Sequence, residues 1–261
     1  MKRKPAPSHG TEVLFRRWRF LLPALVFLAL CGNLSPAAPA PQADSFPPAA
    51  DEALAVVDRM RTAYGQLTGY QVEIETKEYQ DGRVTAARRF RYSLRKANRL
   101  RIDMETPHPG MRLVFPDPEG RVAVRFGGWL KFLQLRLAPD NAMFATASGQ
   151  RIDQSDFGQL IRNIGRSVGE VKRGEPQMEE KCRHLLLTVE ASDHFLLGVV
   201  TRYRFIIDRT LWLPVAVEER TPAGQLKRTI HFRQLNTCPE FPPNFFAIEE
   251  EVVHGSAAEQ Q

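Results

Sequence analysis

The sequence predicts an α+β fold in which a large, curved antiparallel sheet is covered by two or three helices. The clearest observation is residues 199–235, where apolar and polar side chains alternate through three segments joined by two turns. This period of two is typical of strands with one covered face. The order helix, strands, helix, strands does not fit a parallel α/β sheet. Two short helices are too few to seal so wide a sheet, so we expect a groove on its concave face.

The first predicted element is a helix over residues 51–67, because Leu54, Val57 and Tyr64 fall on one face at helical spacing. Alternation then predicts a strand over residues 70–77, and Gln80-Asp81-Gly82-Arg83 has the composition of a hairpin turn. Further strands are expected over residues 90–94, 100–104, 111–115, 122–126 and 129–137.

A second helix is predicted over residues 153–168, since Phe157, Leu160 and Ile164 recur at helical spacing. Ser155, with Asp156 beside it, is the expected N-cap of this helix. Strands resume over residues 185–189 and end in the three-stranded stretch described first.

Residues 1–37 resemble a signal peptide or an N-terminal anchor. Six Lys and Arg residues stand before a mostly apolar run over residues 20–34, and small residues suited to a signal peptidase follow it. The run is shorter than the roughly 20 apolar residues of a spanning helix. Cys31 leaves lipidation open as an alternative. We therefore expect export to the periplasm, with anchoring in the outer or inner membrane through the N-terminus left open.

The charge of the chain lies largely in that segment. Beyond residue 40 the sequence holds 30 Lys and Arg against 29 Asp and Glu, whereas the whole chain has a formal charge of +6. Nucleic-acid binding needs a basic domain or stripe, so no nucleic-acid partner is expected. We predict a flexible Pro- and Ala-rich lead-in over residues 38–49, one domain over residues 50–252 and a disordered tail over residues 253–261.

No catalytic, metal or cofactor motif stands out. No two of the six His stand at the helical spacing of paired metal ligands. Asp208 and Glu218 flank turns, where solvated carboxylates are common, and Ser155 heads a helix. The sequence thus predicts no enzyme, no cofactor and no metal, with an envelope hydrolase as the competing hypothesis.

Two cysteines remain in the predicted domain. Cys182 begins a strand and Cys238 follows the last one, so an oxidising location permits one disulfide at the edge of the sheet. Two buried, unpaired thiols are the alternative.

The C-terminal half also carries a family likeness. Several segments resemble the end of the LolA-like family of bacterial envelope proteins, namely YRFIID at residues 203–208, LPVAVE at residues 213–218, Gly224, IHF at residues 230–232, Asn236 and Asn244-Phe245-Phe246. The opening helix and Pro109-Gly110 resemble an uncharacterised branch of exported bacterial proteins. The resemblance spans about residues 51–249.

The resemblance implies an unclosed β-barrel of about 11 strands, of the LolA/LolB type, lined by apolar side chains and covered by helices. In the best-known members this cavity takes up the acyl chains of lipoproteins. It therefore implies a carrier or chaperone whose partner is a lipid or a lipoprotein acyl chain. The alternative is a regulatory or structural envelope module that binds a membrane-associated protein. The side chains expected to line the cavity, for each of which a core position competes, are Val72, Ile74, Phe90, Tyr92, Leu113, Phe115, Phe126, Trp129, Phe132, Phe157, Leu160, Phe205, Trp212 and Phe232.

Overall fold

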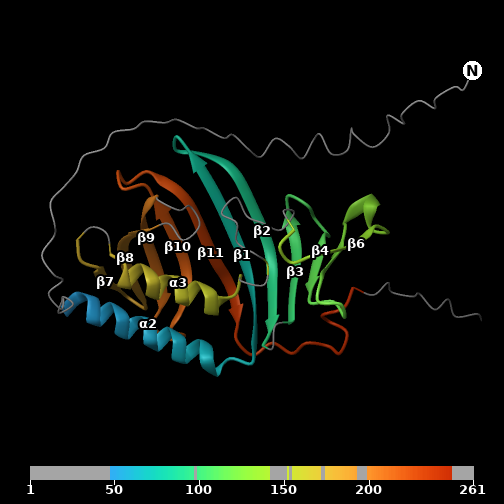
Figure 1. Cartoon of the computed structure of the whole chain (residues 1–261), viewed down its shortest axis with the longest axis horizontal. Helices are drawn as coiled ribbons and strands as arrows, with labels where there is room; N and C mark the ends of the chain where they lie inside the picture. Colours follow the sequence, from blue (N-terminus) through green and yellow to red (C-terminus); the bar gives the residue numbers. More distant parts are fainter. Residues whose placement is uncertain are drawn as a thin grey trace, which may run out of the picture. The chain divides into compact units, whose positions relative to one another are not determined.

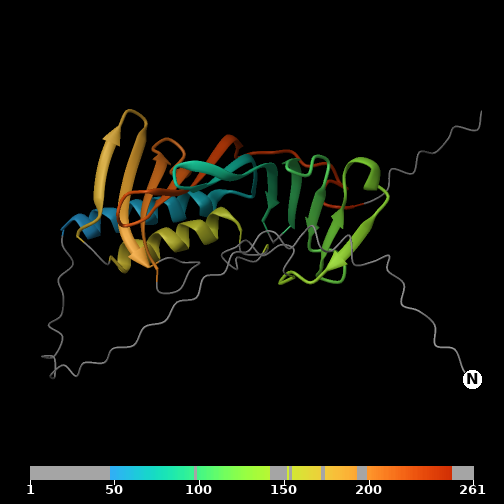
Figure 2. The ribbon, with the colours of Figure 1, turned by 90° about the horizontal axis from the view of Figure 1, so that it is seen from above.

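A computed structural model describes residues 48–96, 99–141, 152, 155–171, 174–192 and 199–248. The predicted signal segment, the lead-in to residue 47, Cys31 and the C-terminal tail lie outside these residues. The described part contains one antiparallel sheet of 11 strands in the order β6-β5-β4-β3-β2-β1-β11-β10-β9-β8-β7, with two α-helices on one face (Figures 1 and 2). Among the described residues, the edge strands β6 and β7 do not pair with each other. The predicted fold class, an unclosed antiparallel sheet with few helices, is confirmed.

The elements have the following bounds: α2 Pro48–Gln66, β1 Gly69–Gln80, β2 Arg83–Arg95, β3 Arg99–Thr106, β4 Arg112–Phe115, β5 Val122–Arg125, the 3₁₀ turn η1 Gly128–Leu130, β6 Gln134–Leu137, α3 Phe157–Gly169, β7 Gln177–Lys181, β8 His184–Ser192, β9 Val200–Asp208, β10 Leu213–Arg220 and β11 Leu226–Asn236. The predicted hairpin turn is present, with positive φ at Asp81 and Gly82. Among the described residues, no helix is both long enough and apolar enough to cross a bilayer.

Two strand predictions need correction. The strand expected over residues 129–137 is only β6, because the chain first forms η1, which begins at Gly128 with a φ of +59°. Gly127 also lies so close to the preceding β3–β4 turn that a Cβ there would be 2.0 Å from the Pro109 carbonyl oxygen. The sequence did not reveal β7, whose segment QMEEK is mostly charged and exposed. Met178 alone gives that edge strand an apolar contact with the core.

The N-cap of α3 is Asp156, so the prediction of Ser155 is wrong. Asp156 has extended backbone angles, and its side chain accepts a hydrogen bond from the backbone N–H of Gln159 at 2.7 Å. Ser155 lies one residue too early and instead donates its hydroxyl hydrogen to the carbonyl oxygen of Ile152 at 2.7 Å. The Asp156 carboxylate also accepts a hydrogen bond from the Tyr64 hydroxyl of α2 at 2.6 Å.

Replacing Asp156 with Ala is expected to lower the free energy of unfolding by about 1–2 kcal/mol, because it removes both a helix cap and a partner of Tyr64. Urea unfolding monitored by circular dichroism measures this change. Asp156→Asn is the matched control and should remain close to the parent, since Asn is an equally good N-cap. A larger loss for Ser155→Ala than for Asp156→Ala would contradict the assignment.

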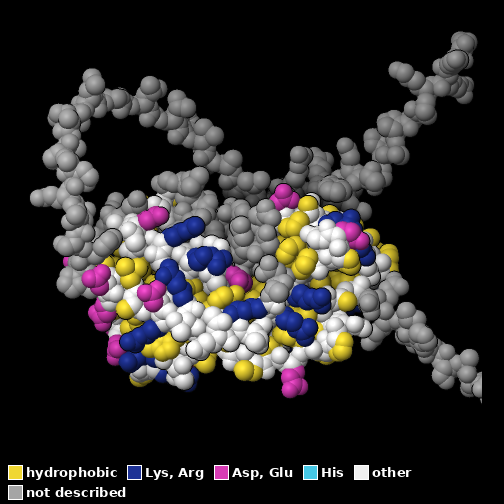
Figure 3. Space-filling model, turned by 60° about the horizontal axis from the view of Figure 1, so that its bottom comes forward, with side chains coloured by type: hydrophobic (Ala, Val, Ile, Leu, Met, Phe, Trp, Pro, Cys, Tyr) yellow, Lys and Arg dark blue, Asp and Glu magenta, His cyan; other side chains and the backbone are white. Residues whose placement is uncertain are grey.

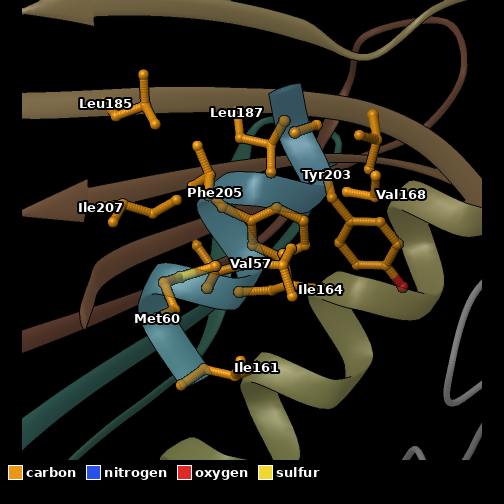
Figure 4. Packing of buried hydrophobic residues seen from close by; sticks show 14 of the residues in the cluster. Val57, Met60, Ile161, Ile164, Val168, Leu185, Leu187, Tyr203, Phe205 and Ile207 are labelled. Carbon is orange, nitrogen blue, oxygen red and sulfur yellow. The ribbon is translucent and has the colours of Figure 1, made fainter. Parts of the chain in front are cut away.

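The two helices cover one half of the sheet. The buried apolar residues between the helices and this half are here called the helix-covered cluster (Figure 4). Val57 and Met60 of α2 and Ile164 of α3 meet Leu187 of β8 and Ile207 of β9, and all five are completely buried. The helices approach closely because Gly158 and Gly165 face α2, where a Cβ would lie 2.7 Å from the Tyr64 ring or 2.9 Å from the Arg61 guanidinium. A branched side chain at either position would separate the helices.

The opposite, outer face of the sheet carries the alternating charges seen in the sequence. Arg89 of β2 lies 2.7 Å from Glu73 of β1 and 3.0 Å from Glu105. Asp103 of β3 accepts hydrogen bonds from Arg101 and Arg112, both at 2.7 Å. Burial alone would raise the pKa of the Asp103 carboxyl, but these two guanidinium groups outweigh it and hold the pKa below its usual range. Arg89, Arg101 and Arg112 of this face are therefore partners of carboxylates.

The segment after β11 returns across that outer face. Phe241, Phe245 and Phe246 pack on one another with ring centroids 4.8–5.0 Å apart. The Arg101 guanidinium lies 4.2 Å from the centroid of Phe245, and its Nη1 donates to the Phe245 carbonyl oxygen at 3.0 Å. Arg95 lies over Phe241 and Phe246 in the same way. The aromatic triplet thus packs on Arg95, at the end of β2, and on Arg101, near the start of β3.

Candidate ligand-binding face

The inner face of the sheet, on which α2 and α3 lie, carries three unbroken apolar rows across β1–β6. Opposed residues of antiparallel strands share a face, so the strand register defines the rows. The first, here called the rim row, is Ile74, Phe90, Met104, Met111, Phe126 and Leu133. The second row is Val72, Tyr92, Ile102, Leu113, Val124 and Leu135, and the third is Tyr70, Leu94, Leu100, Phe115, Val122 and Leu137.

The β4–β5 part of the rim row follows from register. Arg112 lies opposite Arg125 in the ladder, and one further residue along each strand brings Met111 opposite Phe126. The backbone N–H of Phe126 donates to the carbonyl oxygen of Leu133 at 3.2 Å, so the row continues to the start of β6. Apolar side chains therefore extend across all six strands without a polar interruption.

The three rows differ in exposure. Most side chains of the second and third rows are buried, whereas Phe90, Met104, Met111 and Phe126 of the rim row are half-buried. Leu133, at the far end of the rim row, is exposed. The rim row is thus the open side of an apolar surface whose other two rows form a packed core.

The described helices lie mainly over the other half of the sheet. Apart from contacts with each other, α2 and α3 pack chiefly on β7, β8 and β10. Figure 3 shows the consequence at the surface: hydrophobic side chains are exposed in the part formed by β3–β6, on the right of the view, beside several Lys and Arg residues. Neither described helix is thus a lid over the rim row.

An aromatic partition separates the two halves. Phe157, the first residue of α3, packs on Tyr70 of β1 and Phe232 of β11, with ring centroids 4.8 Å and 4.9 Å apart. Tyr70 stacks in turn on Tyr92 of β2 at 5.7 Å. The helix-covered cluster lies on one side of Phe157 and Phe232, and the apolar rows of β1–β6, to which Tyr70 and Tyr92 belong, lie on the other.

Tyrosine hydroxyls supply the polar groups at this partition. The Tyr70 hydroxyl accepts a hydrogen bond from the backbone N–H of Phe157 at 3.1 Å. The Tyr92 hydroxyl lies 3.5 Å from the Ser155 hydroxyl. Burial raises the pKa of the phenols of Tyr64, Tyr70 and Tyr92 above their usual value, and the nearby Asp156 carboxylate raises it further. All three phenols therefore stay neutral at physiological pH.

The residues predicted to line a cavity divide into four groups. Val72, Ile74, Phe90, Tyr92, Leu113, Phe115 and Phe126 lie on the three rows. Phe157, Leu160 and Phe232 pack with the buried side chains of these rows. Phe205 belongs to the helix-covered cluster and Trp212 packs on it, while Trp129, in η1, and Phe132, just after it, are exposed. Contact of any of them with a ligand remains a prediction.

Sequence reasoning missed several residues of the same surface, namely Ile102, Met104, Met111, Leu133 and Leu135. The signal was present for Ile102 and Met104, because both alternate with charged residues within a predicted strand. Their membership of a continuous row depends on strand register, which one sequence does not define.

The two domain cysteines are free and exposed, so the structure lacks the predicted disulfide. Cys182 lies in the β7–β8 turn with φ of +54°, and Cys238 follows β11. Three strand spacings separate β8 from β11, which is about 14 Å and roughly twice the longest Cα separation that a disulfide bridges. The alternative of buried thiols is also wrong.

The groups considered for catalysis have structural roles. Asp208 is buried, and its carboxylate accepts hydrogen bonds from the backbone N–H groups of Thr210 and Leu211 and from Arg183. Burial alone would raise its pKa, but these donors lower the pKa below its usual range, so it is not a solvated turn residue. Glu218 accepts from Arg220 at 3.0 Å. Within the described residues no group of His, Cys, Asp and Glu is arranged to hold a metal ion.

One hollow of about 440 Å³ lies away from the rows, at the β7–β9 end of the sheet. Polar side chains line much of it, among them Gln177, Thr188, Glu190 and Arg202. Arg202 donates to Glu190 through Nε at 2.7 Å. Because charged and polar side chains make up about half of its lining, this hollow is not the predicted apolar groove.

No protein-family model matches the chain, and no curated protein sequence matches it. Solved structures do. A MucA/MucB complex from Pseudomonas aeruginosa matches with a TM-score of 0.44 and 17% identity over 74% of this chain and 59% of that chain. The lipoprotein LppX from Mycobacterium tuberculosis matches with a TM-score of 0.43 and 11% identity over 73% and 98% of the two chains. A LolA superfamily protein from Nitrosomonas europaea matches with a TM-score of 0.34 and 10% identity over 74% and 96%.

The predicted likeness to LolA-like proteins is thus met by structural matches to that group. At identities of 10–17% these matches concern the fold alone. The chain also spans less than two thirds of the chain matched in the MucA/MucB complex. Because the TM-scores are below 0.5, we draw no conclusion about ligand or partner from them.

Proposed function

We propose that this protein is an exported envelope protein that binds an acyl chain of a lipid or a lipoprotein on the inner face of β1–β6, as a carrier or chaperone. The observation that carries the proposal is the rim row, an apolar surface that crosses six strands and stays half exposed. Contiguous exposed apolar surface on a folded protein typically marks an interaction site.

The dimensions and composition of the rim row suit an acyl chain. Five strand spacings from β1 to β6 give the row a length of about 24 Å. An acyl chain that fills one leaflet covers about 15 Å, half of the hydrocarbon core. Two of the six side chains are Met, a flexible residue that adapts to irregular apolar ligands. The row also lacks polar groups that would select a ligand of fixed shape.

Native mass spectrometry of protein purified without detergent tests the proposal. Co-purifying lipid, or stoichiometric uptake of a fluorescent fatty acid, is the expected result. An empty protein that also fails to bind the fatty acid contradicts acyl-chain binding and favours the alternative of a protein-binding envelope module. Export is tested separately by the N-terminal sequence of the protein recovered from the periplasm.

The double substitution Met104→Gln/Met111→Gln is expected to weaken binding of a fluorescent fatty acid by about tenfold, since it places two polar groups in the centre of the rim row. Fluorescence titration measures the change. The matched control is Met104→Leu/Met111→Leu, which keeps the surface apolar at similar volume and should bind like the parent. Arg125→Gln, on the outer face of β5, should also have no effect. Equal affinity for all four proteins would place the ligand elsewhere.

A further inference from the structure

The connection between β5 and β6 carries the two most exposed of the large apolar side chains in the described domain. Trp129 is 81% exposed and Phe132 is 71% exposed, and Leu133 beside them is also exposed. Lys131 stands between the two aromatic residues and is exposed as well. We call residues 129–133 the tip. Isolated exposed apolar residues are common, but adjacent Trp and Phe with a Lys between them have the composition of a membrane-interface segment.

The tip has a defined backbone. The N–H of Lys131 donates to the carbonyl oxygen of Gly128 at 3.3 Å, and the N–H of Leu133 donates to that of Leu130 at 2.8 Å. Gly127, just before the tip, lies against the β3–β4 turn, where only a glycine fits. Hydrogen bonds and this close contact therefore present the aromatic side chains outward.

The charge around the tip is basic. Residues 121–137 contain four Lys and Arg and no Asp or Glu. Arg121 and Arg136 are paired with Asp117 and Glu119 of the preceding turn. Within the described residues, no ion pair involves Lys131 or Arg125. The charges nearest to Trp129 and Phe132 in the sequence, Lys131 and Arg125, are thus positive and complement an anionic surface.

We propose that the tip docks on an anionic lipid surface, with Trp129 and Phe132 in the interfacial layer and Lys131 at the headgroups. A lipid surface accounts for the aromatic residues and the positive charge together, because aromatic rings favour the membrane interface and Lys residues near anionic lipids add to binding. The surface is too small for a stable protein–protein interface by itself.

The location of the tip deepens the proposed function, on which this part of the inference rests. Leu133 is both the last residue of the tip and the end of the rim row, paired with Phe126. A docked tip therefore places the open row at the edge of the bilayer. An acyl chain that moves between the bilayer and the row then has continuous apolar contact and does not cross water.

The docking test uses the full chain with Trp18 replaced by Phe, which leaves Trp129 and Trp212 as the tryptophans. The vesicles are phosphatidylcholine, with and without phosphatidylglycerol, and contain lipids brominated in their acyl chains. Bromine quenches a Trp side chain that enters the bilayer. We expect quenching in the parent that is largely lost in Trp129→Gln and is stronger with phosphatidylglycerol. Trp212→Phe is the matched control and should retain the quenching, because Trp212 lies against Arg59 and the helix-covered cluster. Equal quenching of parent and Trp129→Gln would overturn the docking proposal.

The link to the acyl chain is tested with Trp129→Gln/Phe132→Gln and a fluorescent fatty acid. Because both residues are also among the predicted lining residues, the rate of transfer to vesicles is compared with the rate of release into vesicle-free buffer. The ratio of the two rates should fall about tenfold, the factor that about 1.4 kcal/mol represents. An unchanged ratio overturns the delivery role. If the parent itself binds no fatty acid, the proposed function fails, whereas the Trp129 quenching still decides whether the tip docks. Unchanged circular dichroism of Trp129→Gln and of Trp129→Gln/Phe132→Gln confirms that these variants are folded.

Discussion

Extending a bound fatty acid by four methylenes, from 12 to 16 carbons, is expected to tighten its binding by about 200-fold, because each buried methylene contributes about 0.8 kcal/mol. The rim row, at about 24 Å, is long enough for the whole of such a chain. Isothermal titration with a series of saturated fatty acids, each below its micelle concentration, measures the dependence. Met104→Gln/Met111→Gln should give a shallower dependence, because the added methylenes then meet amide groups.

The same titration can contradict the proposal. A ligand held by its carboxylate alone would show the same affinity at every chain length. A dependence that is as steep in Met104→Gln/Met111→Gln as in the parent would show that the acyl chain lies on another surface. Met104→Leu/Met111→Leu controls for the loss of Met itself, and it should reproduce the slope of the parent.

Replacing Phe157 with Ala is expected to lower the free energy of unfolding by about 3–5 kcal/mol, the usual cost of removing a buried Phe. Phe157 is 3% exposed and packs on Tyr70 and Phe232, so its ring joins α3 to the sheet. Urea unfolding monitored by circular dichroism gives the change. Because the same ring separates the two halves of the inner face, the variant should also lose part of its affinity for a fatty acid.

Phe132→Ala is the matched control for this prediction, since it deletes the same ring from the exposed tip. Its free energy of unfolding should stay within about 0.5 kcal/mol of the parent, as is usual for surface substitutions. If Phe157→Ala costs less than about 1 kcal/mol, α3 is held mainly by the helix-covered cluster and Phe157 is not its attachment to β1.

Local patterns in the sequence predict much of this fold because each strand shows its own alternation. Residues 70–77, for instance, correctly predict β1, since apolar and charged side chains take turns along it. β7 has no such alternation, because it is an edge strand with one apolar residue facing the core. Asp156 and Ser155 are both good N-caps, and the choice between them depends on where the tyrosine rings of the sheet allow α3 to begin.

The candidate site is less accessible to sequence reasoning. That Met104 lies beside Met111 depends on the β3–β4 register, and that Phe126 lies beside Leu133 depends on a turn whose glycine packs against another turn. These are contacts between residues that belong to different elements, so no local pattern contains them. The same limit applies to Cys182 and Cys238, which look suitable for a disulfide in the sequence. Cys182 lies between β7 and β8 and Cys238 follows β11, and β11 is not a neighbour of β7 or β8 in the sheet.

The aromatic partition has a consequence for how such a protein can diverge. The cluster beneath α2 and α3 supplies a large share of the buried core, and a change there threatens folding. The rim row lies beyond Phe157 and Tyr70, where a substitution alters the surface offered to a ligand at a small cost in stability. Selection for a new ligand can therefore act on one half of the sheet while the other half stays nearly constant, and two descendants with the same fold need not share a cargo.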